Sequence, residues 1–114
     1  MNTVFHKDQL GGGGEYTVTN ITVSSGVGTI ALLENRTIYR FSAALSQLVI
    51  SGKSAGWNEN SMAQLVFTWA ASLNATPINY GSSGVTAFDM TYPIAGRYCE
   101  ISIFNNKARI GHGQ

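Results

Sequence analysis

The sequence predicts an all-β fold, a single antiparallel β-sandwich or jelly-roll-like domain with an extended N-terminal arm. Short segments rich in Val, Ile, Thr, Tyr and Phe recur from Glu15 onward, and these residue types favour strands. Gly, Ser, Asn and Pro separate the segments about every 8–12 residues, which is typical of sandwiches and jelly rolls. The chain of 114 residues has the length of one domain and shows no internal repeat.

Residues 1–14 form the predicted arm, and residues 15–114 form the predicted β-sandwich domain. Gly11 to Gly14 make a four-glycine hinge, because each glycine loses much backbone entropy on ordering and such a run disfavours regular structure. The apolar side chains of the arm are Val4, Phe5 and Leu10. We expect them to contact a neighbouring subunit, for instance by adding a strand to its sheet.

The predicted strands are short, and most are bounded by turn residues. Asn105-Asn106 is predicted to form the last hairpin turn, because Asn tolerates the left-handed backbone conformation that a tight hairpin requires. In chain order the expected strands span residues 15–24, 28–34, 37–43, 47–51, 63–70, 78–80, 85–92, 97–104 and 107–110.

One segment, residues 62–75, fits two patterns. Met62, Leu65 and Trp69 fall at helical spacing, whereas Ala63, Leu65, Phe67 and Trp69 alternate as in a strand. We favour a strand, because the Val-Phe-Thr-Trp run is strongly β-prone. The side chains expected in the core are Tyr39, Phe41, Leu48, Ile50, Leu65, Phe67, Trp69, Cys99, Ile101 and Ile103.

Charge and hydropathy exclude several classes of protein. Only 11% of the residues are charged, where about 25% is typical, and the net charge is +1 with no basic block. Nucleic-acid binding needs several cations on one face, so it is not expected. No apolar stretch is long enough to predict a membrane span, and the N-terminus lacks the apolar core of a signal peptide. The chain is therefore expected to be made in a cytosol and kept there, or packed into something assembled there. A surface with so little charge suits a protein that is packed against neighbours.

Reactive residues form no recognisable constellation. The single Cys99 excludes an internal disulfide and a cysteine-based zinc site, and its place in an apolar strand predicts a buried, inert thiol. His6 and His112 lie in terminal segments without a spaced partner. Glu59 and Asp89 could be imagined as a glycosidase pair, but nothing near them supports this. We therefore expect no enzyme activity, no metal and no cofactor.

Trp57 lies in a polar loop, residues 52–61, and three roles are open to it. With Asn58, Glu59 and Asn60 beside it, an exposed Trp57 could bind a sugar ring by stacking and hydrogen bonds. It could also be a protein–protein anchor, since Trp is enriched at interface hot spots. In the third alternative it packs against one end of the sandwich.

Two segments carry a family resemblance. The first is AGRYCEISIFNNKARI, residues 95–110, with a glycine turn, an aromatic residue, Glu-Ile-Ser-Ile and an Asn-Asn turn before a final apolar strand. The second is NRTIYRFSAALSQLVISG, residues 35–52, with a Tyr-Arg-Phe strand and then Leu45, Leu48 and Ile50. In this order they resemble modules of bacteriophage tail-fibre, collar and head-decoration proteins. Residues 88–92 depart from that pattern, since such modules usually place a Trp there.

The resemblance implies a structural virion protein, a capsid decoration (cement), collar or tail component, made in the host cytoplasm. It implies binding to other virion subunits and a homo-oligomer, with a trimer favoured, and neither cofactor nor catalytic residues. On this hypothesis the partner contacts are Val4, Phe5, Leu10 and Trp57. The alternative is a carbohydrate-binding receptor-recognition module of a phage fibre, with a host glycan held by Trp57, Asn58, Glu59 and Asn60.

Overall fold

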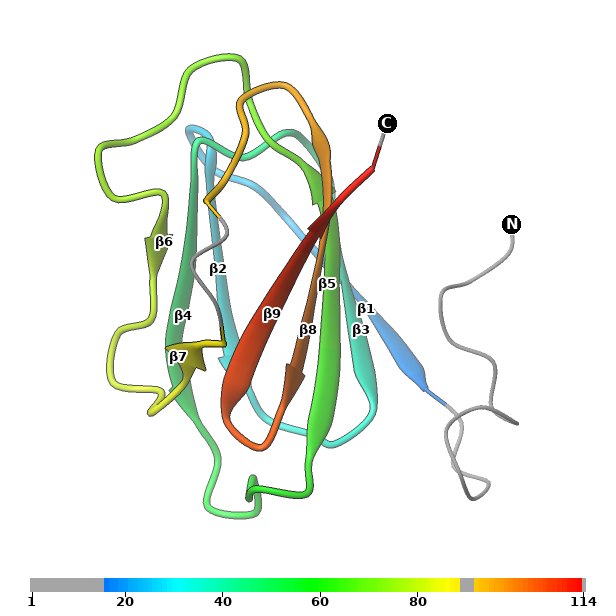
Figure 1. Cartoon of the computed structure of the whole chain (residues 1–114). Coiled ribbons are helices and arrows are strands. Elements are labelled where there is room, and N and C mark those ends of the chain that lie inside the picture. The colour runs from blue at the N-terminus through cyan, green and yellow to red at the C-terminus, as the bar shows by residue number, and fades with distance from the viewer. Residues whose placement is uncertain (1–15, 89–91, 114) are drawn as a thin grey trace.

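The computed structural model describes residues 16–88 and 92–113, and this part of the chain is all-β, with nine strands and no helix (Figure 1). The predicted arm therefore lies outside the described residues. The strands are β1 (Thr17–Ile21), β2 (Val27–Leu32), β3 (Thr37–Phe41), β4 (Gln47–Lys53), β5 (Met62–Thr68), β6 (Ile78–Asn79), β7 (Thr86–Ala87), β8 (Tyr98–Phe104) and β9 (Lys107–His112).

The strands form two sheets that enclose one hydrophobic core. The larger sheet has the order β1-β3-β5-β8-β9-β7, and the smaller one has the order β2-β4-β6 (Figure 1). The first six strands alternate between the two sheets, so each connection crosses from one layer to the other. Since each connection also reverses the chain, strands two apart in sequence run parallel side by side.

The prediction of antiparallel sheets is wrong for most of the described strands. Five pairings are parallel, namely β1 with β3, β3 with β5, β2 with β4, β4 with β6 and β7 with β9. Two pairings are antiparallel, β5 with β8 and β8 with β9. Short turns between alternating segments suggested hairpins, whereas most of them here are arches across the core.

The core prediction is confirmed in its main features. Nine of the ten expected side chains are buried, and Phe41 is half-buried with its ring edge-to-face on Phe67 at 5.5 Å. The ambiguous segment is the strand β5, which lies between β3 and β8 and sends Ala63, Leu65 and Phe67 into the core. The predicted strand over residues 85–92 is much shorter, with Thr86–Ala87 as β7 and residues 89–91 outside the description.

The Asn105-Asn106 turn has the predicted left-handed conformation. Both residues have a φ of 55°, which is the geometry of a tight hairpin turn joining β8 to β9. A side chain without a polar group that bonds locally adopts this region only at a cost, whereas glycine adopts it freely.

We expect Asn105→Ala to lower the free energy of unfolding by about 1 kcal/mol, because alanine is strained at this φ. The matched variant Asn105→Gly should leave stability within about 0.5 kcal/mol of the wild type. Urea denaturation followed by circular dichroism measures both changes. Equal losses for the two variants would show that the Asn105 side chain, and not its backbone conformation, stabilises the turn.

Candidate interaction surface

Trp57 is a core residue of this chain. It lies in the loop between β4 and β5, is 5% exposed, and its Nε1–H donates a hydrogen bond to Asn106 Oδ1 at 3.0 Å. The loop folds back on itself through the bonds Trp57 N–H to Ser54 O and Ser61 N–H to Asn58 O. The ring is therefore packed in the core, as the third alternative expects, and is not exposed for the partner or sugar contact that the other two alternatives require.

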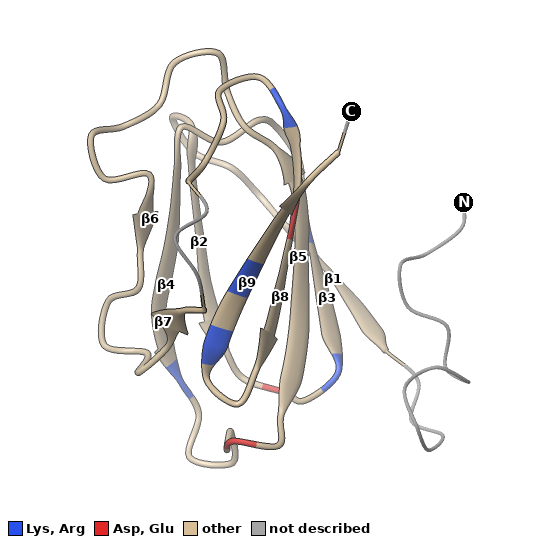
Figure 2. Ribbon diagram, viewed as in Figure 1, with Lys and Arg blue, Asp and Glu red and all other residues tan. Residues whose placement is uncertain are grey.

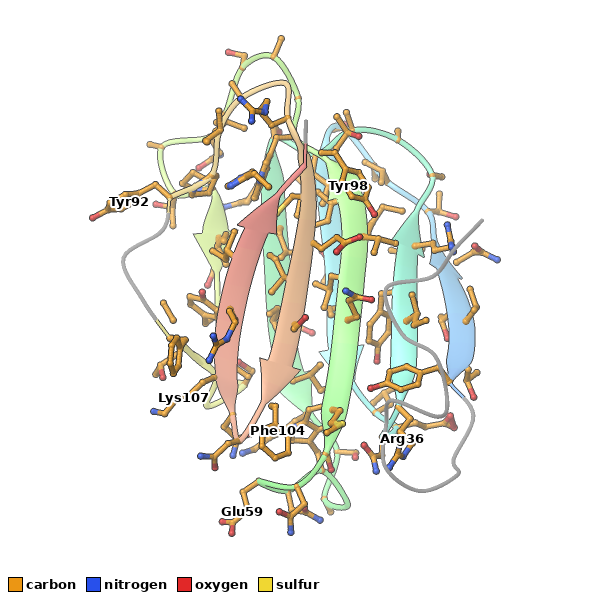
Figure 3. The ribbon with its side chains drawn as sticks, turned by 45° about the vertical axis from the view of Figure 1, so that its right-hand side comes forward. Arg36, Glu59, Tyr92, Tyr98, Phe104 and Lys107 are labelled. Carbon is orange, nitrogen blue, oxygen red and sulfur yellow. The ribbon has the colours of Figure 1, made fainter. Side chains whose placement is uncertain are left out.

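The three neighbours of Trp57 are exposed, but they form no sugar site with it. The Asn58 Oδ1 atom accepts a hydrogen bond from the Asn60 N–H at 2.8 Å, so this amide stabilises the loop. Glu59 projects from the loop into solvent (Figure 3). Asn58, Glu59 and Asn60 therefore lack the aromatic platform on which the prediction depended. The expected contacts Val4, Phe5 and Leu10 lie outside the described residues, so they remain a prediction.

The larger sheet has one face turned away from the core, which we call the outer face. Alternate residues of β1, β3, β5, β8 and β9 form it, and Figure 3 shows Tyr98 and Phe104 at opposite ends of β8 on this face. One row crosses all five strands, because the registers pair Val18 with Ile38, Ile38 with Gln64, Gln64 with Ser102, and Ser102 with Arg109.

Gln64 is the unusual residue of this row. Its neighbours Ala63 and Leu65 point into the core, so Gln64 belongs to the outer face, yet it is only 2% exposed. Its Nε2 atom is buried and donates no hydrogen bond. Ile38 beside it is also buried, at 6% exposure. A buried amide without a partner costs about 1–3 kcal/mol, and such atoms are rare in native structures.

A hollow of about 270 Å³ opens at the β8–β9 end of the outer face. The residues that line it are Phe88, Ser102, Phe104, Asn105, Lys107 and Arg109. The Arg109 guanidinium carbon lies 4.0 Å from the centroid of the Phe88 ring, a cation–π contact. Both cations of the hollow lie on β9 (Figure 2). The alternation of residues 97–110 could have placed Phe104, Lys107 and Arg109 together, whereas nothing local in the sequence joins Phe88 to them.

The ionisable groups of the last hairpin are structural. Burial raises the pKa of the Cys99 thiol to about 12, against a smaller lowering by the Trp69 side chain, so the thiol is inert as expected. Burial, with the hydrogen bond that Tyr98 OH donates to Glu100 Oε2 at 2.8 Å, raises the pKa of Tyr98 to about 12. Burial and then Arg97 lower the pKa of His112, whose Nε2 accepts a bond from the Ile94 N–H at 3.3 Å.

Within residues 16–88 and 92–113, no group of three or more His, Cys, Asp or Glu side chains could hold a metal ion. The same residues contain no helix that could cross a membrane. No family model matches the chain, and the searches of curated proteins and of solved structures give no significant match. The functional assignment of this chain therefore rests on its own surface.

Proposed function

We propose that the chain is a structural protein of a bacteriophage virion, a capsid-decoration (cement), collar or tail component that binds neighbouring subunits through its outer face. The observation that carries this proposal is the apolar part of the outer face, where Val18 and Phe104 are each 50% exposed and Tyr98 is 37% exposed. The resemblance of residues 35–52 and 95–110 to phage modules supports it. So does the low content of charged residues, 11%, because crowded copies then repel each other little.

The composition of the outer face is that of a protein interface. It combines the apolar side chains of Val18, which is 50% exposed, and the half-buried Val66 with the polar side chain of Ser102. Protein interfaces combine such apolar contacts with a few hydrogen bonds. A neighbouring subunit that covered Val18 and Phe104 would remove their apolar surface from water, which favours association. The partner is a second copy of the chain, with a trimer favoured, or another capsid, collar or tail subunit.

The finer description of the module follows from the same fold. Two sheets around one core support a β-sandwich with mixed strand directions, and the parallel pairs separate it from an antiparallel jelly roll. The arm residues Val4, Phe5 and Leu10 provide a second contact with the neighbour.

Val18→Asp tests the outer face. We expect the full-length protein to be an oligomer by light scattering, and Val18→Asp to raise the dissociation constant by at least tenfold, since it places a charge in the apolar contact. The matched control is Asn79→Asp in the smaller sheet, which makes the same charge change and keeps the acceptor for the Gly81 N–H. It should leave the mass unchanged. A wild-type protein that is monomeric and binds no virion subunit, or equal effects of the two variants, would refute the proposal.

The arm is tested separately in the full chain. Replacement of Val4, Phe5 and Leu10 by Ser removes its apolar side chains and should shift the oligomer toward monomer, because three apolar contacts are lost. An unchanged oligomer mass in this variant would exclude the arm as a contact. It would not contradict the proposal for the outer face.

The alternative function, carbohydrate recognition by a phage fibre, loses its predicted site because Trp57 is buried. A carbohydrate would need another site, and the hollow lined by Phe88, Phe104, Lys107 and Arg109 is the surface feature to test for one.

A further inference from the structure

Two positive charges and two aromatic rings meet in the hollow beside the β8–β9 turn. Lys107 and Arg109 are two residues apart on β9, so both project from the outer face, and none of the described residues that line the hollow is acidic. Phe88 and Phe104 are each 50% exposed. Figure 3 shows Phe104 and Lys107 at the same end of the sheet. The hollow therefore offers cationic groups and apolar walls to one ligand.

The strand register fixes how these groups are arranged. Lys107 lies opposite Phe104, and Arg109 lies opposite Ser102. The Arg109 guanidinium is held over the Phe88 ring, and a stacked guanidinium keeps its N–H groups at the edge free for a carboxylate. Ser102 and Asn105 add a hydroxyl and an amide to the lining. The cations can therefore bind an acidic group of a polar ligand, and the hydroxyl and the amide can bind its hydroxyl groups.

The walls of the hollow are fixed by the fold. The turn below it is bound to the core by Trp57 Nε1–H, which donates to Asn106 Oδ1 at 3.0 Å. The Thr86 N–H donates to Asn106 O at 3.1 Å, and the Phe88 N–H donates to Ala108 O at 2.7 Å. Phe88 is thereby positioned beside β9. A preorganised site loses less conformational entropy when it binds a ligand.

We propose that this hollow binds a carboxylate-bearing sugar residue, such as a uronic or sialic acid. The carboxylate pairs with Arg109 and Lys107, the C–H face of the ring lies on Phe104, and the hydroxyls reach Ser102 and Asn105. The volume of about 270 Å³ lies below that of sites for drug-sized ligands, roughly 300–1,000 Å³, and suits one sugar residue. An acidic side chain of a protein would use the two cations alone, so the aromatic walls favour the sugar. This inference goes beyond the virion proposal and does not depend on it.

The test is an NMR titration of the isotope-labelled full-length protein with trigalacturonate and with sialyllactose. We expect at least one of them to shift the amide signals of Phe88 and of residues 102–109, with a dissociation constant of about 1 mM. Arg109→Gln and Lys107→Gln should each weaken binding about tenfold, because a charge-assisted hydrogen bond is lost. Phe104→Ser should weaken it by a similar factor, because one apolar wall is removed.

Three controls make the outcome decisive. Lys53→Gln, on β4 of the smaller sheet, removes a cation elsewhere and should bind like the wild type. The methyl ester of trigalacturonate lacks the charge and should not bind. Triglutamate carries carboxylates without a sugar ring and should bind more weakly than the sugar acids. No shift with either sugar acid, shifts away from the hollow, or equal binding of triglutamate that Phe104→Ser leaves unchanged would overturn the proposal.

Discussion

Trp57→Ala should lower the free energy of unfolding by about 3–5 kcal/mol, the usual cost of removing a buried aromatic side chain. The ring belongs to the core cluster and is 5% exposed, so the surrounding residues cannot fill the space that it leaves. The variant also removes the donor that holds Asn106 Oδ1. Urea denaturation measured by circular dichroism, with the linear extrapolation to water, gives the change.

Trp57→Phe separates the two contributions. It keeps a buried six-membered ring but loses the pyrrole part of the indole with its Nε1–H donor, so we expect a smaller loss, about 1–2 kcal/mol. Leu33→Ala is the control, because Leu33 is 62% exposed and its truncation should change stability by less than about 0.5 kcal/mol. If Trp57→Ala left stability unchanged and dissociated an oligomer, Trp57 would be a partner contact and not a core residue.

Local sequence patterns predicted the strands well, because side-chain alternation is a property of each strand by itself. Residues 97–104 alternate as Tyr98, Glu100, Ser102 and Phe104 outward and Cys99, Ile101 and Ile103 inward, and β8 follows that pattern. The Asn105-Asn106 turn is predictable for the same reason, since both residues tolerate a positive φ.

The sheet topology was not predictable, because it depends on where each connection leads. The link between Phe41 and Gln47 has a length that a hairpin could also have, yet β4 pairs with β2 in the other sheet and not with β3. The alternation of polar and apolar residues shows which side chains of a strand point inward. It does not show to which sheet the strand belongs, because strands of both sheets have the same alternation. Neighbouring strands in one sheet are parallel because each connection crosses to the other sheet before the chain returns.

The burial of Trp57 and Gln64 was hidden for a different reason. Trp57 stands among Gly, Asn, Glu and Ser, which suggests exposure, but the loop turns its ring inward toward Asn106, far away in sequence. Gln64 lies in a hydrophobic strand, and its outward position was implied by Ala63 and Leu65. Its burial was not, because alternation does not show what covers an outward side chain. Local polarity thus suggested an exposed Trp57, whereas tertiary packing decides which side chains are buried.

The second large effect is a loss of stability in alkali. The pKa of the Cys99 thiol rises from 9.0 to about 12 because of burial, so the folded protein holds this proton more tightly than the unfolded chain does. Stability from this group is complete below pH 9, falls as the pH rises from 9 to about 12, and is lost above that range. A change from 9.0 to about 12 corresponds to about 4 kcal/mol as an upper limit.

Cys99→Ala isolates the thiol from the other groups that titrate in alkali. Tyr98, with a pKa raised from 10.0 to about 12, acts in the same direction but begins one pH unit higher, and its side chain is partly exposed, so its contribution is smaller. Between pH 9 and 10 the wild type should therefore lose stability more steeply than Cys99→Ala, with a difference in slope approaching about 1.4 kcal/mol per pH unit. Tyr98→Phe should keep that early slope and flatten the curve only above pH 10.

Equal slopes for wild type and Cys99→Ala from pH 9 to 10 would mean that the thiol ionises as easily in the folded chain as in the unfolded one, and hence that solvent reaches Cys99. A thiol reagent at neutral pH gives an independent check, because a buried thiol of raised pKa should react only at the rate at which the protein unfolds.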